Sequence, residues 1–223
     1  MPIGVPEAEF VSNPEPRCPC VLLLDTSGSM EGEPINELNN GLLELKKQLD
    51  ADNLARQRVE IAIVSFGGTP TVVTDFVTVD AFNPPTLGFG GRTPMGAAIE
   101  MGLKMLQDRK LEYKNAGVNY YRPWIFLITD GAPTDAWDQA AAQVRDGVNG
   151  KKFSFYAVGV QGADTSILSQ ISPVNVPPLT LNGLNFTELF KWLSVSLSQI
   201  SKSKGGDQMV PLAPVTGWAA TTS

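Results

Sequence analysis

The chain has 223 residues, and its 17 Lys and Arg against 23 Asp and Glu give a formal net charge of −6. An acidic protein of this kind is a poor general binder of nucleic acid. The sequence contains no histidine, which excludes histidine-based nucleophile pairs and histidine-ligated zinc or iron sites.

The cysteine count and the apolar runs indicate the compartment. Cys18 and Cys20 are too few for a disulfide framework or a four-ligand metal site, and such near neighbours in an extended chain do not reach disulfide geometry. We expect two free, partly buried thiols. The first residues lack the apolar core of a signal peptide, and no apolar run approaches the roughly 20 residues that span a bilayer. These features predict a cytoplasmic protein in a reducing compartment, without a membrane segment.

Composition divides the chain into three parts. Residues 1–16 contain four prolines and are expected to form an extended N-terminal lead-in. Residues 17–203 are expected to fold as one α/β domain, because strand-like and helix-like segments alternate along them and no internal repeat is visible. Residues 204–223 are expected to form a C-terminal tail, in which Trp218 docks onto the domain.

The first half of the domain predicts a strand, a helix, a hairpin and a second helix. Residues 20–25 (CVLLLD) are an apolar run that ends in a carboxylate, which is typical of a central strand buried on both faces. Pro34 suits the first turn of a helix whose apolar residues recur at helical spacing as far as Leu49. Residues 59–66 and 71–79 predict an antiparallel hairpin at a sheet edge. The loop NPPTLGFGGRTP then leads into a helix over residues 95–109.

The second half of the domain begins with the same sequence pattern as the first strand. Residues 124–130 (WIFLITD) again form an apolar run that ends in Asp followed by Gly. Helices are expected over residues 136–148, 164–171 and 185–201, and strands over residues 153–160 and 179–181. This alternation predicts an α/β fold with a doubly wound, mostly parallel sheet, one antiparallel edge strand and helices on both faces.

Oxygen-bearing side chains follow the expected strand ends. Loops at the carboxyl edge of a doubly wound sheet converge, so these loops can meet although they are far apart in sequence. Alternate residues of an extended loop point the same way, which puts Asp25, Ser27 and Ser29 on one side. Thr93, before an expected helix, and Asp130, at the second strand end, complete the pocket. Each residue alone is an ordinary cap, turn or loop residue, but their joint occurrence indicates a metal site.

An all-oxygen pocket suits a hard divalent cation, and we expect Mg²⁺ first and Mn²⁺ next. Two carboxylates neutralise such an ion only when both coordinate it directly. If one of them is held off by water, the ion keeps a positive charge. An Asp or Glu from a protein partner would then complete its shell.

The order of these five residues resembles a known family. The von Willebrand factor A (vWA) domain carries a metal-ion-dependent adhesion site with the pattern D-x-S-x-S, then T, then D, which is matched here by Asp25, Ser27, Ser29, Thr93 and Asp130. The resemblance implies the Rossmann-like vWA fold for residues 17–203. It also implies that Asp25 acts mainly through water and that Ser27 and Ser29 bind directly. Thr93 and Asp130 would exchange direct for water-mediated contact.

Several longer segments resemble, more narrowly, the bacterial tellurium-resistance type of this domain. They are DTSGSM, EIAIVSFG, RTPMGAAI, YYRPWIFLITDGAPTD, FYAVGV and FKWLSVSLSQIS. This resemblance implies a cytoplasmic, non-catalytic protein-binding module in a bacterial stress response related to tellurite resistance. Kinase or phosphatase proteins of the same system would be among its partners, and neither nucleic acid nor a membrane would be a ligand.

Two other functions stay open on the residues alone. A metal-dependent phosphotransferase or phosphatase of the haloacid dehalogenase type also begins with an aspartate at a strand end, but it needs a second Asp two residues later, where this chain has Ser27. A structural α/β scaffold with a vestigial site is the other alternative. Nucleotide binding is not indicated, because the sequence has no GxxxxGKS or GxxxxGKT motif and GFGG lacks the dinucleotide fingerprint. We therefore expect no enzymatic activity.

Overall fold

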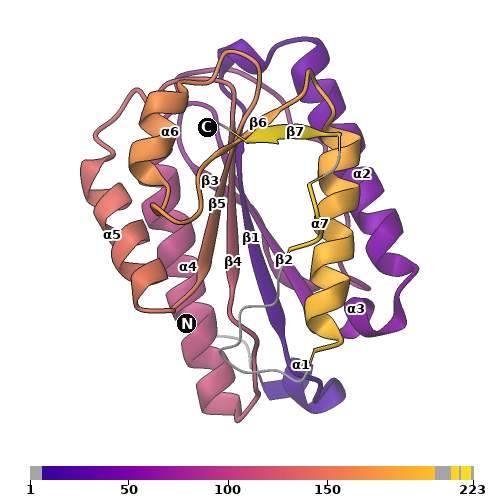
Figure 1. Ribbon diagram of the computed structural model, residues 1–223. Coiled ribbons are helices and arrows are strands. Elements are labelled where there is room, and N and C mark those ends of the chain that lie inside the picture. Colours follow the sequence, from indigo (N-terminus) through magenta and orange to yellow (C-terminus); the bar gives the residue numbers. More distant parts are fainter. Residues whose placement is uncertain (1–6, 204–211, 216, 222–223) are drawn as a thin grey trace.

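The computed structural model describes residues 7–203, 212–215 and 217–221, and within them one sheet organises the chain (Figure 1). Its strands are β1 (Cys18–Asp25), β2 (Val59–Phe66), β3 (Thr71–Thr78), β4 (Trp124–Thr129), β5 (Ser154–Gly159), β6 (Leu179–Leu181) and β7 (Ala219–Thr221). The spatial order is β3-β2-β1-β4-β5-β6-β7, in which β3 and β7 are antiparallel to their neighbours and the other pairs are parallel.

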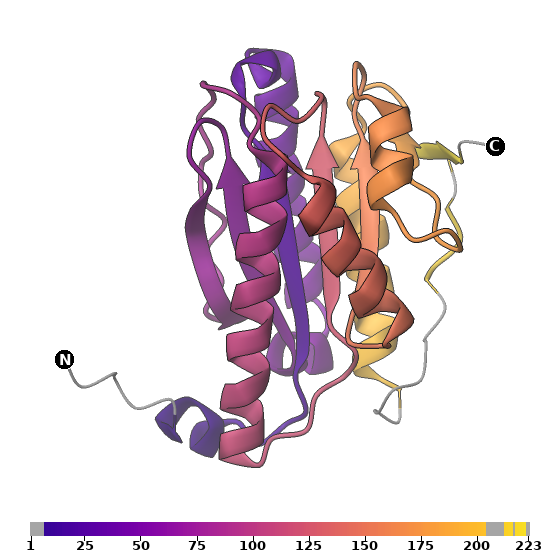
Figure 2. The ribbon, with the colours of Figure 1, turned by 90° about the vertical axis from the view of Figure 1, so that its left-hand side faces the viewer.

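Helices cover both faces of this sheet, as Figures 1 and 2 show. The helical segments are α1 (Glu7–Ser12), a 3-10 turn η1 (Gly28–Met30), α2 (Glu33–Asp50), α3 (Asn53–Arg58), α4 (Met95–Ala116), α5 (Asp138–Asn149), α6 (Thr165–Ile171) and α7 (Phe186–Ser201). Buried residues of α2, α3 and α7 form one hydrophobic core with one face of the sheet, and those of α4, α5 and α6 form a second core with the other. The predicted α/β fold class is therefore confirmed.

β1 is an interior strand between β2 and β4, and all of its residues are buried. Leu22 and Leu24 belong to the core under α2 and α7, whereas Val21 and Leu23 belong to the core under α4. α4 comes close to β1 at Gly102, where an added Cβ atom would lie 2.8 Å from Cδ2 of Leu23. The apolar run of the sequence therefore serves both cores, as expected for a strand of a parallel sheet.

The expectation of an extended lead-in is wrong for residues 7–12, which form α1. Phe10 of this helix is buried and meets the ring of Tyr113 edge-on at 5.8 Å between centroids. Glu9 forms a 2.8 Å ion pair with Arg109. Both anchors lie about a hundred positions away on α4, so local composition carries no sign of them. Residues 1–6 of the predicted lead-in lie outside the described part of the chain.

Two helices differ from the sequence expectations. α3 was not predicted, although the carboxylate of Asp52 caps it by accepting hydrogen bonds from the backbone N–H groups of Leu54 and Ala55 at 3.0 and 3.2 Å. α4 continues to Ala116 rather than ending near Arg109. Its stop is Gly117, whose φ of 68° provides the left-handed cap that commonly ends a helix.

The described part of the C-terminal tail docks onto the domain, as predicted for Trp218. That side chain is 2% exposed, and its ring lies 4.9 Å from the ring of Trp192 on α7. β7 follows directly and pairs with β6, so the sheet gains a second antiparallel strand at the edge opposite β3. Residues 204–211, 216 and 222–223 of the predicted tail lie outside the described residues. None of the helices described has the length and apolar character needed to cross a bilayer.

Candidate metal centre

The five predicted site residues lie at the carboxyl edge of the sheet. Asp25 is the last residue of β1, and Asp130 follows the last residue of the neighbouring strand β4. Because these two strands are parallel and adjacent, their carboxyl ends reach the same edge, which is the upper edge in Figure 2. Thr93 reaches this edge from the loop that precedes α4.

Asp25 is fully buried, and both of its carboxylate oxygens accept hydrogen bonds. Oδ1 accepts from the backbone N–H of Ser27 at 2.8 Å, and Oδ2 accepts from the hydroxyl of Thr129. Burial raises the pKa of Asp25 above its ordinary value, with a smaller contribution from the nearby charge of Asp130, while the hydrogen bonds from Thr129 and Ser27 oppose the rise. The carboxylate is thus held rigidly beneath the loop that follows β1.

Ser27, Ser29 and Asp130 form a chain of contacts across this edge. The hydroxyl oxygens of Ser27 and Ser29 lie 3.0 Å apart, and Ser29 donates a 2.8 Å hydrogen bond to Oδ1 of Asp130. Burial also raises the pKa of Asp130, and the hydrogen bond from Ser29 counteracts it. The loop after β1 therefore brings Ser29 to the second strand-end carboxylate and Ser27 beside Ser29.

Thr93 completes the group. Its side chain is buried, and an added Cβ atom at Gly131 would lie 3.7 Å from Oγ1 of Thr93 and 3.9 Å from Oγ of Ser29. The two hydroxyls therefore approach Gly131 from different loops. Thr134 fixes the backbone of Thr93. The hydroxyl of Thr134 accepts a 3.1 Å hydrogen bond from the N–H of Thr93, and the N–H of Thr134 donates a 2.9 Å hydrogen bond to the carbonyl of Thr93. All five predicted residues thus converge.

The charge of this cluster fits a divalent cation. Asp25 and Asp130 are close enough for the charge of one to raise the pKa of the other, yet within the described ranges neither carboxylate pairs with a Lys or Arg. The remaining donors are hydroxyl oxygens, so the set is composed of the hard ligands that Mg²⁺ and Mn²⁺ prefer. A bound cation would offset the repulsion between the two carboxylates.

Sequence reasoning missed Thr129 and Asp135. The hydroxyl of Thr129 donates to Asp25 and accepts a 3.2 Å hydrogen bond from the N–H of Gly131, so it links the two strand ends. The carboxylate of Asp135 accepts from the N–H groups of Gly96 and Ala97 at 3.0 and 2.8 Å. It caps α4 from another segment, while Pro94 at the N-cap position makes no side-chain bond. A local capping pattern cannot reveal such a partner.

A glycine-rich loop over residues 88–92 rests on the loop after β1. The N–H of Gly90 donates to the carbonyl of Thr26 at 2.8 Å, and the N–H of Gly28 donates to the carbonyl of Gly91 at 3.1 Å. Gly91 has a φ of 77°, which favours glycine. Phe89, which directly precedes Gly90, is 48% exposed.

Comparison with known proteins places the chain in a family. The von Willebrand factor type A domain profile matches residues 20–189. The collagen alpha-6(VI) chain of Mus musculus is 27% identical over 159 residues, which cover 68% of this chain and 6% of the collagen.

Solved structures share the fold at low identity. The pilus adhesin SpaC from Lactobacillus rhamnosus GG superposes with a TM-score of 0.67 at 14% identity, over 82% of this chain and 30% of the adhesin. Proximal thread matrix protein 1 from the mussel byssus, in a structure described as having a zinc-occupied MIDAS motif, gives a TM-score of 0.55 at 18% identity, over 82% of this chain and 48% of that one. The chain thus spans less than half of each of these relatives. Because the family profile covers well over half of the sequence, the protein belongs to the von Willebrand factor type A domain family.

Proposed function

We propose that this vWA domain is a non-catalytic, metal-dependent protein-binding module. Mg²⁺ or Mn²⁺ would be held by Asp25, Ser27, Ser29, Thr93 and Asp130, and a partner Asp or Glu would complete its shell. The observation that carries the proposal is the contact chain from Ser27 through Ser29 to Asp130 beside a carboxylate with no cationic partner among the described residues. The name of the mussel protein structure, with its zinc-occupied motif, supports a divalent ion at such a site in a relative of the same fold.

The hydrogen bonds of Asp25 support a role through water. Both of its oxygens are already engaged, one by the N–H of Ser27 and one by the hydroxyl of Thr129. The hydroxyls of Ser27 and Ser29 would then bind directly, as the family pattern implies. With only one carboxylate in direct contact, a bound divalent ion supplies a residual positive charge, which attracts an external carboxylate.

The rim of the site supports a partner that is both acidic and apolar. Phe89 is 48% exposed on a loop whose neighbouring residues are fixed by backbone hydrogen bonds. Arg92 on the same loop is exposed, and no carboxylate pairs with it in the part of the chain that the structure describes. We infer that the partner places one Asp or Glu on the metal, an apolar side chain on Phe89, and a second acidic group near Arg92.

The alternatives receive less support. Members of the vWA family are generally binding modules rather than catalysts. The dehalogenase-type reaction needs an acid at the position of Ser27, whose hydroxyl here contacts Ser29. A scaffold with a vestigial site would not require two carboxylates to lie near one another without a cationic partner, since that arrangement costs stability.

The cellular setting is also a proposal. The resemblance of the longer segments to the tellurium-resistance type supports a bacterial, cytoplasmic stress response related to tellurite resistance. Kinase or phosphatase proteins of the same system would then be candidate partners.

The decisive experiment is a capture of partners with and without metal. Immobilised wild-type protein is exposed to host lysate in Mg²⁺ or in EDTA, beside an Asp25→Ala variant. We expect a protein that is retained only by the wild type and only in Mg²⁺, and that is lost when one of its own acidic residues is replaced by the amide. Retention that is insensitive to EDTA and to Asp25→Ala would overturn the proposal.

A further inference from the structure

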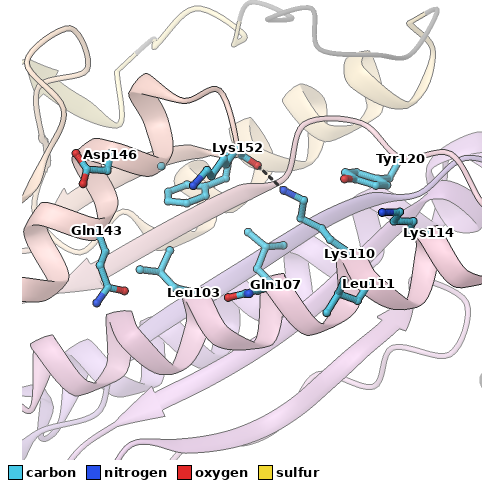
Figure 3. A pocket seen from close by; sticks show the side chains of 12 residues that line it. Leu103, Gln107, Lys110, Leu111, Lys114, Tyr120, Gln143, Asp146 and Lys152 are labelled. Carbon is cyan, nitrogen blue, oxygen red and sulfur yellow. Dashed lines mark hydrogen bonds between the residues drawn. The ribbon is translucent and has the colours of Figure 1, made fainter.

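A groove of about 710 Å³ lies between the second halves of α4 and α5, away from the candidate metal centre (Figure 3). Its floor includes Leu106 and Phe153, which are 2% and 6% exposed, and Leu103 and Leu111 contribute further apolar surface. Sites for small organic ligands span roughly 300 to 1,000 Å³ and are mostly apolar. The groove therefore has the size and lining of a ligand site, and none of its lining residues belongs to the metal centre.

Close packing fixes α4 and α5 on the two sides of the groove. Near its start, α4 touches the chain that leads into α5, because an added Cβ atom at Gly96 would lie only 2.3 Å from the carbonyl oxygen of Ala136. Further along, the ring of Phe153 packs directly on α5 at Gly147, where a Cβ atom would lie 2.2 Å from the ring. Close packing therefore holds the two flanking segments in place, and Phe153 is a fixed part of the groove lining.

Basic residues line the groove, with Lys110 and Lys114 near one end beside Tyr120 in Figure 3. The ammonium group of Lys110 donates a 3.2 Å hydrogen bond to the carbonyl of Lys152 and lies 5.8 Å from the centroid of the Tyr120 ring. No carboxylate pairs with Lys114 or Lys152 among the residues described. Asp146 is the one acidic residue in the lining.

This local charge is opposite to that of the protein as a whole. The lining carries three lysines against one aspartate, whereas the chain has a net charge of −6. A positive groove on an acidic protein concentrates anions at that place. Apolar walls beside the lysines add a preference for an anion that also carries a hydrocarbon body.

We propose that this groove binds a small amphipathic carboxylate. The carboxylate group would contact Lys110 and Lys114, and the hydrocarbon body would lie on Leu103, Leu106 and Phe153. The groove volume of about 710 Å³ lies within the range of sites for small organic ligands, which favours such a ligand over an acidic peptide.

The test uses octanoate as the anion and 1-octanol as its uncharged counterpart. Both are titrated into the Asp25→Ala variant in EDTA, so that octanoate cannot bind a metal ion in place of a partner carboxylate, and ¹H–¹⁵N spectra are recorded. We expect saturable octanoate binding with shifts at the lining residues, and weaker binding of octanol. A Lys110→Gln/Lys114→Gln double variant should bind octanoate about fivefold more weakly or worse, since two charge contacts are lost.

Lys104→Gln is the matched control, because Lys104 is an exposed lysine of the same helix, pairs with Asp108 and lies outside the lining. It should bind octanoate as the parent protein does. A Leu103→Ser variant tests the apolar contact and should weaken octanoate and octanol alike. The proposal is overturned if octanoate does not saturate, if octanol binds equally well, or if only an acidic peptide binds at these residues. None of these results bears on the metal site, which is disabled throughout.

Discussion

Ser29 donates a 2.8 Å hydrogen bond from its hydroxyl to Oδ1 of Asp130, a residue that lies 101 positions later in the chain. The contact is possible because β1 and β4 are parallel neighbours and end at the same edge of the sheet. The site is therefore assembled by the pairing of the two strands and not by either loop alone. Its geometry should survive single changes in the loops, so such variants report on chemistry and not on folding.

Metal binding is the first consequence to measure. Calorimetric titration of Mg²⁺ and Mn²⁺ into chelator-treated protein should give one ion per chain. Asp25→Ala should abolish the signal, because it removes a carboxylate that holds the ion through water, and Ser29→Ala should weaken it at least about tenfold, because it removes a direct hydroxyl ligand. Ser169→Ala, an exposed serine on α6, is the control. Equal affinities in the wild type and Asp25→Ala would show that the ion binds elsewhere.

Thr129 should matter although it is not a predicted ligand. Its hydroxyl donates to Asp25, and Thr129→Val removes that donor while keeping the shape of the side chain. Residues that orient metal ligands typically contribute about 10- to 100-fold in affinity, so we expect a loss of about tenfold in the same titration. Thr74→Val on the edge strand β3 should bind metal normally. An unchanged affinity in Thr129→Val would mean that Asp25 needs no support from β4.

Much of the site could be predicted because its residues follow recognisable strand ends. The apolar runs that end at Asp25 and Asp130 identify two buried strands, and parallel strands must bring their ends together. Thr129 could not be assigned a role in this way. Its contact with Asp25 depends on the register that sets Leu24 beside Ile128, and no pattern within either strand fixes that register.

The fold was predictable to the same extent and for the same reason. Most helices and strands of the domain are indicated by local periodicity, although α3 was missed. α1 gives no such signal, since Phe10 and Glu9 are held by Tyr113 and Arg109 of α4. β7 was missed likewise, because three residues acquire strand geometry only by pairing with β6. Elements that form only through contacts with distant residues, such as α1 and β7, cannot be predicted from local sequence patterns.

Asp135 should stabilise the fold as a distant helix cap. Its carboxylate accepts the N–H groups of Gly96 and Ala97 at the start of α4, where the helix dipole also favours a negative charge. Asp135→Ala should cost about 1 kcal/mol, which lowers the melting temperature by roughly 2 to 4 °C in a chain of this size. The melting temperature of Asp135→Asn should lie between those of the wild type and Asp135→Ala. An exposed control, Asp80→Ala, should melt as the wild type does, and the cap is unimportant if Asp135→Ala does so too.

The largest single loss of stability is expected at Glu60, which is fully buried. Its carboxylate accepts from Arg17 at 2.9 Å, from Arg109 at 2.9 and 2.8 Å, and from the hydroxyl of Tyr113. Glu60→Gln keeps the shape but leaves the buried Arg17 without its counter-charge. Breaking a buried pair in this way costs about 3 to 5 kcal/mol.

Urea unfolding measures this loss directly as a lower midpoint. Glu188→Gln is the control, because it removes an exposed pair with Lys191 at 2.7 Å, and exposed pairs contribute little. A midpoint shift for Glu60→Gln no larger than that of Glu188→Gln would show that the cluster is dispensable.

The two cysteines should be unreactive in the folded protein. Both thiols are free and buried, and burial, with the charge of Glu60, raises the pKa of Cys18 to about 12, while burial raises that of Cys20 well above its ordinary value. Because the thiolate is the reactive form, an aromatic disulfide reagent at pH 8 should label neither residue in buffer and both in urea.

The raised pKa of Cys18 also makes the stability of the fold depend on pH. A pKa raised in the folded state means that folding favours the neutral thiol. The contribution of this thiol to the free energy of unfolding is therefore complete below pH 9 and is lost as the pH rises toward 12. A Cys18→Ala/Cys20→Ala variant should show a shallower loss of stability over that range, and an identical pH profile would contradict the assignment.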